Sequence, residues 1–221
     1  MSMSLSRNRL AAVALSTIAL TASLSACAPL LMGGAVTGAF VATDRRTSGI
    51  QLEDQGIELR AANRLREQMG ERGSVSITSY NRQVLLTGEV PTEQDKALAE
   101  KTVSGVDNVR SIVNELAVLG SASLTQRSSD TLITGQVKAA MVDARDLYAN
   151  AFKVVTSRGT VYLMGRVTQR EADRGTEITR NTSGVQRVVR VLEIISEEEL
   201  ARLLPKPAAA PAPVQNATPA K

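Results

Sequence analysis

A short apolar stretch occurs twice in this chain, and that repetition limits the possible folds more than any other feature. Residues 84–90 read VLLTGEV and residues 161–167 read VYLMGRV, 77 positions later. Each copy is followed by a Ser-Gly-Val triplet, and the triplet glycines, Gly105 and Gly184, lie 79 positions apart. Two separate motifs repeated at nearly the same spacing indicate a duplicated domain. What one unit does, and what tethers the pair, should therefore determine the function.

The composition removes most of the groups that catalysis uses. The chain has no His and a single Cys, so it lacks the usual general base and metal ligand and can form no internal disulfide or CxxC pair. It contains no GxGxxG or GxxxxGK[ST] phosphate loop, and the acidic run Glu197–Glu199 is typical of a helix start rather than a metal site. We predict that the protein is not an enzyme and has no catalytic residue, cofactor or metal.

The N-terminus carries the pattern of a lipoprotein signal. Two arginines precede an apolar run at 10–24, which is too short to span a membrane comfortably and is typical of a secretory signal peptide. The run ends in LSAC, which resembles the bacterial lipobox and makes Cys27 the expected site of lipid attachment. We predict a signal peptide at 1–26; the alternative is an ordinary signal sequence with an unmodified cysteine. Ala rather than Asp at position 28 predicts the periplasmic face of the outer membrane.

The first repeat follows a tether. Residues 27–49 are predicted to be the lipidated cysteine and a flexible segment, because glycines interrupt any helix there. The repeat itself, 50–119, begins with a helix whose apolar residues recur every four positions from Ile57 to Met69. The elements that follow are predicted as a strand at 74–79, a strand at 84–90, a helix from the N-cap Thr92 to about 103 and a strand at 109–116. The order is αββαβ.

The second repeat follows a linker predicted at 120–129 and covers 130–204 with a short C-terminal helix. Asp130 is expected to cap a helix over 131–149, whose apolar residues step by three and four from Ile133 to Leu147. The elements that follow are predicted as strands at 151–157 and 161–167, a helix starting at the capping box Thr168–Glu171, a strand at 188–195 and a helix after Ser196. The Pro/Ala-rich residues 205–221 are predicted to be disordered.

The two repeats differ in charge. Lys and Arg number 10 against 12 Asp and Glu in residues 44–120. They number 11 against 7 in residues 121–195, the second repeat without its acidic C-terminal extension. The second repeat is therefore the basic one, which suits an anionic partner such as phospholipid or nucleic acid; the alternative is a surface simply solvated by arginine. The predicted compartment and the lack of aromatic side chains for base stacking argue against nucleic acid.

Both copies resemble the BON domain, an αββαβ unit marked by a V-x-L-x-G-x-V strand and a later G-V-x-x-V strand entry. With its lipobox, Asp44–Arg46 and the run 162–171, the chain resembles the dual-BON outer-membrane lipoproteins of the DolP group. The resemblance implies an α+β fold of two tandem αββαβ BON domains after a lipoprotein signal peptide. It also implies that the second domain binds anionic phospholipid, that the protein supports envelope integrity, and that it works near the outer-membrane protein assembly machinery and the division site. The chain departs from the group in its Pro/Ala tail and in lacking an aromatic membrane anchor on the second-domain helix.

The second-domain helix carries the candidate lipid contacts. If its apolar stripe faces the core, Leu132 and Val142 lie well off that face, and Lys138 and Arg145 flank Val142 on the outer side. Exposed apolar side chains beside cations suit contact with an anionic, phosphatidylglycerol-like membrane. We predict that these four residues bind phospholipid. Two nearby aspartates would oppose headgroup phosphate, and isolated exposed apolar residues need no special explanation.

The predicted function is that of an outer-membrane lipoprotein whose second domain binds anionic phospholipid and so supports barrier integrity and stress resistance. Two alternatives remain open. One is a protein–protein adaptor for the outer-membrane protein assembly or division machinery, with incidental lipid affinity; the other is a general periplasmic stress protein. Lipid binding should need anionic headgroups and weaken with salt, whereas an adaptor should bind its partner without lipid.

Overall fold

The computed structural model describes residues 44–203. The predicted signal peptide, Cys27, the tether as far as residue 43 and the Pro/Ala tail lie outside the described residues. Within the described part, no helix has both the length and the apolar character needed to cross a membrane. Residues 44–203 all belong to one compact unit, Phe40–Lys221.

The first repeat contains helix α3 (Ser48–Met69), strands β1 (Ser74–Tyr80) and β2 (Gln83–Val90), helix α4 (Glu93–Ser104), and strands β3 (Ser111–Asn114) and β4 (Ala117–Val118). Strand β1 pairs antiparallel with β2, and β3 and β4 both pair parallel with β2. The predicted N-cap Thr92 is confirmed, because its side chain accepts a hydrogen bond from the backbone N–H of Asp95. The αββαβ order is confirmed.

The last strand of the first repeat is shorter than predicted. A continuous strand at 109–116 is wrong, because pairing with β2 stops at Asn114 and resumes at Ala117. The gap lies opposite Thr87 and Gly88, where Gly88 has a φ of 112°. A residue in that conformation interrupts a regular ladder and is favourable only for glycine. Gly88 therefore marks the break between β3 and β4 in the first repeat, whereas its equivalent Gly165 lies in continuous pairing of β6 with β7.

The second repeat contains helix α5 (Leu124–Asp143), a 3₁₀ turn η2 (Ala149–Ala151), strands β5 (Phe152–Ser157) and β6 (Thr160–Val167), helix α6 (Gln169–Arg180), strand β7 (Arg187–Ile194) and helix α7 (Glu197–Leu203). Its sheet has the order β5-β6-β7, with β5 antiparallel and β7 parallel to β6. The predicted capping box at Thr168 and Glu171 is confirmed. The two repeats thus share one topology.

The start and end of α5 differ from the prediction. The helix begins at Leu124 with Ser123 as its N-cap, so the predicted linker at 120–129 is largely helical and Asp130 is not a cap. The helix also ends at Asp143 rather than at 149. Asp130 is a buried residue inside the helix, and its carboxylate accepts hydrogen bonds from the turn between β5 and β6.

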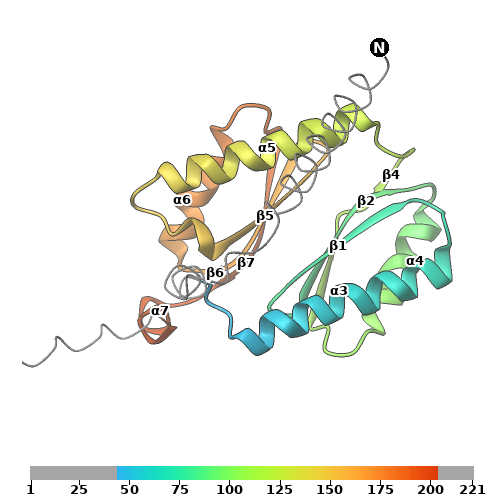
Figure 1. The fold of residues 1–221 in the computed structure, drawn as a ribbon, viewed down its shortest axis with the longest axis horizontal. Coiled ribbons are helices and arrows are strands. Elements are labelled where there is room, and N and C mark those ends of the chain that lie inside the picture. Colours follow the sequence, from blue (N-terminus) through green and yellow to red (C-terminus); the bar gives the residue numbers. More distant parts are fainter. Residues whose placement is uncertain (1–43, 204–221) are drawn as a thin grey trace, which may run out of the picture. The chain divides into compact units, whose positions relative to one another are not determined.

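Each sheet is covered on one face by its own two helices (Figure 1). Helices α3 and α4 enclose a core with Val84, Leu86 and Val90 of β2. Helices α5 and α6 enclose a second core with Val161, Leu163 and Val167 of β6. A third cluster joins the other faces of the two sheets and consists of Tyr80, Leu85, Tyr162, Met164 and Val191. Burial on both faces explains why the repeated strand reads as an almost continuous apolar run.

Candidate functional site

Helix α5 presents a row of exposed apolar and small side chains away from its core. Its buried residues are Asp130, Ile133, Val137 and Met141. On another face Leu124 is 83%, Leu132 67% and Val142 69% exposed. Ser128, Gly135 and Ala139, also exposed, lie between them along the helix. The six residues recur every three or four positions and therefore form one row, which we call the outer stripe.

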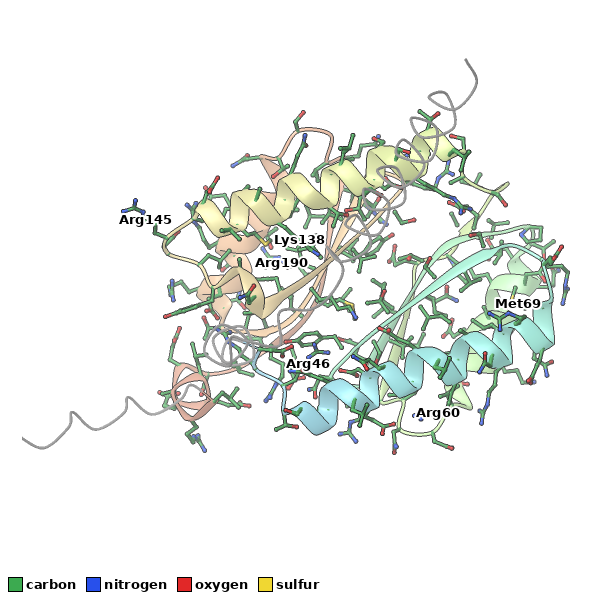
Figure 2. All side chains as sticks on the ribbon, in the orientation of Figure 1. Arg46, Arg60, Met69, Lys138, Arg145 and Arg190 are labelled. Carbon is green, nitrogen blue, oxygen red and sulfur yellow. The ribbon has the colours of Figure 1, made fainter. Side chains whose placement is uncertain are left out.

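The four residues predicted to contact lipid do not all lie on the helix. Leu132 and Val142 belong to the outer stripe, and Lys138 is exposed beside it. Arg145 is exposed in the turn after the helix ends (Figure 2), not on the helix face. The structure therefore places three of the four on α5 and the fourth just beyond its C-terminus. Their binding of phospholipid stays a prediction.

The two aspartates near these cations differ in their surroundings. Asp146 lies in the turn after α5, and its Oδ2 is 2.9 Å from Nε of Arg174. That ion pair compensates part of its negative charge toward any nearby headgroup. Asp143, the last residue of α5, is exposed. Fewer uncompensated acids therefore face the outer stripe than the sequence indicates.

Tyr148 is a candidate contact residue that the sequence reasoning missed. Helix α5 itself has no aromatic side chain, but Tyr148, in the turn between α5 and η2, is 55% exposed. Tyrosine is enriched at membrane–water interfaces because its ring is apolar and its hydroxyl is polar. The signal in the sequence is that Tyr148 directly follows Leu147, the last residue of the predicted core-facing stripe. A residue next to that stripe points away from the core, and Leu147 is buried as predicted.

Two buried aspartates hold the hairpin turns against the helices, and sequence reasoning missed both. The backbone N–H groups of Arg158 and Gly159 donate to the carboxylate of Asp130 at 2.8 and 2.9 Å. In the first repeat, Asp54 of α3 accepts from the corresponding turn at residues 81–82, at 2.8 Å in both cases. The two aspartates lie 76 positions apart, close to the spacing of the repeat. Asp130 thereby fixes α5 against β5 and β6.

The segment before α3 contacts both repeats. Nη1 and Nη2 of Arg45 donate to Glu171 of α6 at 2.7 and 2.6 Å, and Nη1 also donates to the carbonyl oxygen of Arg166 at 2.8 Å. The next residue, Arg46, forms an ion pair with Asp54 at 2.8 Å and lies 4.1 Å from the centre of the Tyr80 ring. Arg45 therefore binds the second repeat and Arg46 the first.

The hydrogen-bond partners of Glu171, which pairs with Arg45, lower its pKa. Burial opposes ionisation of Glu171, but hydrogen bonds from Arg45 and from the backbone N–H of Thr168 outweigh burial and hold its pKa below the usual value. The ion pair is therefore charged at neutral pH. Among residues 44–203, no group of three His, Cys, Asp or Glu side chains comes together in a way that could hold a metal ion.

The family follows from a comparison with known proteins. The model of the BON domain matches residues 54–120 and 129–196, which are the two repeats. The chain belongs to the BON-domain family. We name the repeats BON1 and BON2.

Relatives place the chain in the dual-BON group that includes DolP. It is 38% identical over 178 residues to the outer membrane lipoprotein DolP of Haemophilus influenzae, covering 79% of this chain and 92% of that protein. It is 31% identical over 154 residues to the 21 kDa hemolysin of Actinobacillus pleuropneumoniae, covering 69% and 79%. It is 29% identical over 117 residues to the osmotically-inducible protein Y of Escherichia coli K12, covering 52% and 58%.

BON1 provides a comparison surface for the outer stripe. Its helix α3 also exposes two leucines, Leu52 at 70% and Leu59 at 64%. BON1 with its lead-in has more acidic than basic residues, whereas residues 129–196 of BON2 have an excess of three basic residues. Exposed apolar side chains therefore occur on both domains, but only in BON2 do they lie on a domain with a net positive charge.

Proposed function

We propose that BON2 binds anionic phospholipid of the phosphatidylglycerol type through the outer stripe of α5, with Leu132 and Val142 inserting and Lys138 and Arg145 attracting headgroups. The observation that carries the proposal is the row of exposed apolar side chains on α5 in the basic domain. A helix with such a row lies in the membrane interface with its apolar face toward the acyl chains. Tyr148 adds an interfacial aromatic at the same end as Arg145.

The expected affinity is modest. Each cation near an anionic surface contributes on the order of 1 kcal/mol, so Lys138 and Arg145 give weak binding that apolar insertion increases. A protein that is already anchored to the bilayer needs only this weak affinity, because tethering raises the effective concentration of the membrane surface near BON2. The domain would then act as a sensor of lipid composition rather than as the anchor itself.

The anchor and location form part of the same proposal. We infer acylation at Cys27 and a position on the periplasmic face of the outer membrane, where the protein supports envelope integrity and stress resistance. The lipobox in the sequence and the name of the DolP relative as an outer membrane lipoprotein support this location. The name of the osmotically-inducible relative supports a role in the response to osmotic stress.

A second candidate function is that of an adaptor for the outer-membrane protein assembly machinery. The exposed Leu52 and Leu59 of α3 lie seven residues apart on BON1 and therefore on one helix face. Two such leucines suit the apolar centre of a protein–protein contact. An adaptor of this kind would bind its partner without lipid.

The test compares these two helices in one protein. Residues 40–221 contain both cores and both sheets complete, so this fragment folds without the acyl anchor. We expect it to co-sediment with phosphatidylglycerol vesicles and not with phosphatidylcholine vesicles, and to be released by salt. Leu132→Glu should abolish sedimentation, whereas Leu59→Glu, at a site of nearly equal exposure, should leave it unchanged.

Other outcomes would redirect the assignment. Binding that survives Leu132→Glu would show that the outer stripe is not the lipid contact. Loss of binding only in Leu59→Glu would move the site to BON1. Absence of binding to either vesicle would favour the adaptor function. Circular dichroism of both variants checks that their folds are intact.

A further inference from the structure

A crevice lined mainly by hydroxyl-bearing and charged residues lies between BON1 and BON2, away from the outer stripe. Strands β1 and β2 form one wall, and α5 and β5 form the other. The cavity measures about 220 Å³. BON1 contributes the hydroxyl groups of Ser74, Ser76 and Thr87. BON2 contributes those of Thr131, Thr134, Thr156 and Ser157.

Two buried groups of BON1 have unused hydrogen-bonding capacity in this crevice. Thr87 is 2% exposed, and its hydroxyl makes no hydrogen bond with any described residue. Glu89 is 4% exposed, and its sole polar contact among residues 44–203 is Nη1 of Arg158, 3.6 Å from Oε1. Neither side chain has an atom among the fully enclosed, unpartnered nitrogen and oxygen atoms of residues 44–203. Both residues line the cavity, so a ligand there would complete their hydrogen bonding.

The sequence places these groups by simple alternation along β2. Leu85, Thr87 and Glu89 share the face that is turned toward BON2, where Leu85 packs in the cluster between the sheets. The corresponding positions in BON2 hold Tyr162, Met164 and Arg166. The polar pair is therefore specific to BON1. The positive φ of Gly88, between the two, interrupts the sheet at the crevice.

The charges of the wall exclude most ligand classes. The carboxylates of Glu89 and Asp130 oppose an anion such as a phosphate headgroup. Arg127 and the nearby Arg158 oppose a free cation. Ala122 and Val155 are the only wholly apolar side chains among the lining residues, and a hydrocarbon would leave the hydroxyl and charged groups of the wall without partners.

With anions, cations and hydrocarbons disfavoured, the crevice suits an uncharged ligand that both donates and accepts hydrogen bonds. The hydroxyls of Thr131 and Thr134 already donate to carbonyl oxygens of α5 and can still accept. Three further hydroxyls of the wall make no hydrogen bond with a described residue and can donate and accept, namely Ser76, Thr87 and Ser157. Carboxylates accept, and Arg127 donates. Arg127 already bridges the domains through its hydrogen bond to Oγ of Ser74 at 3.2 Å, so part of the wall is held in place. We propose that this crevice is a carbohydrate-binding site, which adds a second activity to that proposed for α5.

The site has room for more than one sugar unit. A neighbouring cavity of about 340 Å³ also has Gly88 and Ser157 in its wall, so the two cavities lie on either side of these residues. The second cavity adds Lys96, Tyr162 and Arg187. An oligosaccharide chain therefore suits the combined space better than a single sugar. Its acidic substituents, where present, would face the cations of the second cavity.

The test is a titration of the isotope-labelled fragment 40–221 with chitotriose and with maltotriose, followed by ¹H–¹⁵N NMR. We expect at least one of them to shift the amide signals of 74–76, 87–89 and 155–157. Thr87→Val keeps the shape of the side chain and removes the free hydroxyl, so it should weaken binding about tenfold. Thr125→Val, on the exposed side of α5 and outside the crevice, should not.

A second variant fills the crevice but keeps the Thr87 hydroxyl, and so tests whether the ligand occupies the crevice. Thr131 is exposed on α5 and lines the crevice, so Thr131→Trp should block it without disturbing the core. Thr125→Trp is the matched control. Three results would overturn the proposal. The first is that neither saccharide moves the amide signals of the crevice. The second is that Thr87→Val and Thr131→Trp bind the saccharide as tightly as the unchanged protein, and the third is that glycerol 3-phosphate moves the crevice signals but neither saccharide does. Vesicle binding should be unchanged in Thr87→Val, which separates this site from the lipid contact.

Discussion

Arg45 forms a two-point ion pair with Glu171, a residue 126 positions further along the chain, and the two side chains are only 3% and 1% exposed. Residues that precede BON1 in the sequence thus complete the structure of BON2. The same Glu171 caps α6, so one carboxylate serves both a local helix start and a distant arginine. The lead-in segment is therefore part of the folded protein and not of the tether.

Removal of Arg45 should destabilise the protein strongly. Arg45→Ala leaves the Glu171 carboxylate buried without its partner, which costs about 3–5 kcal/mol. Arg60→Ala is the matched control, because Arg60 and Glu53 also lie 2.6 Å apart but are 39% and 31% exposed. An exposed pair contributes at most about 1 kcal/mol. Urea unfolding of fragment 40–221 measures both. Equal costs for the two variants would show that burial does not set the strength of the Arg45 pair.

Acid should weaken the fold through Glu171 and Glu193. Burial raises the pKa of Glu193, but hydrogen bonds from Asn81 and Arg110 outweigh it and leave the pKa below the usual value, as for Glu171. The unfolded chain then binds more protons than the native one as the pH falls, so stability declines with pH. The stability that the two ionised carboxylates contribute should be fully present above the pKa of about 4.3 that glutamate has in the unfolded chain. It should be lost as the pH falls through the lower pKa values of the two carboxyl groups in the folded protein.

The pH dependence can be assigned with a single variant. Glu193→Gln keeps an acceptor for Asn81 and Arg110 but does not titrate. Its urea midpoint should fall less between neutral pH and the acid range than that of the unchanged protein. A midpoint that falls by the same amount in both proteins would remove Glu193 from the explanation.

Loss of Asp130 should loosen the BON2 hairpin. Its carboxylate accepts from the N–H groups of Arg158 and Gly159 and is buried. Hydrogen bonds to a charged group contribute about 1.5–3 kcal/mol each, so Asp130→Ala should cost at least about 2 kcal/mol. Asp143→Ala, at an exposed site of the same helix, should cost little. Hydrogen exchange should show the amides of 158 and 159 losing protection in the first variant alone.

Neutralisation of Lys138 on α5 and Arg145 in the turn after it should weaken membrane binding without removing it. Replacing Lys138 and Arg145 by Ala removes two contributions of about 1 kcal/mol each, or roughly 30-fold in affinity for phosphatidylglycerol vesicles. The remaining binding should also depend less on salt. Replacing Arg66 and Lys101, two exposed cations of BON1, is the control. A larger effect from the BON1 pair would place the membrane contact on the first domain.

Local signals predicted most of the fold. The repeated strand, the N-cap Thr92 and the capping box at Thr168 all arise from residues within one element or its immediate neighbours. The start of α5 was mispredicted because Asp130 has the chemistry of an N-cap. Its real partners, the N–H groups of 158 and 159, lie almost thirty residues away. Leu132 and Val142 were predicted as exposed because helical periodicity alone separates them from the core.

The sequence by itself therefore determined the duplicated αββαβ fold and the outer stripe of α5, because hydrophobic periodicity and capping act over a few residues. The tertiary structure alone decided that Arg45 meets Glu171 and that Thr87 and Glu89 become buried beside a crevice. Thr87 and Glu89 alternate along β2 with residues of the BON1 core and so lie on the opposite face of the strand. Packing of the two sheets against each other buries that face, and such packing depends on side chains that lie some 80 residues apart.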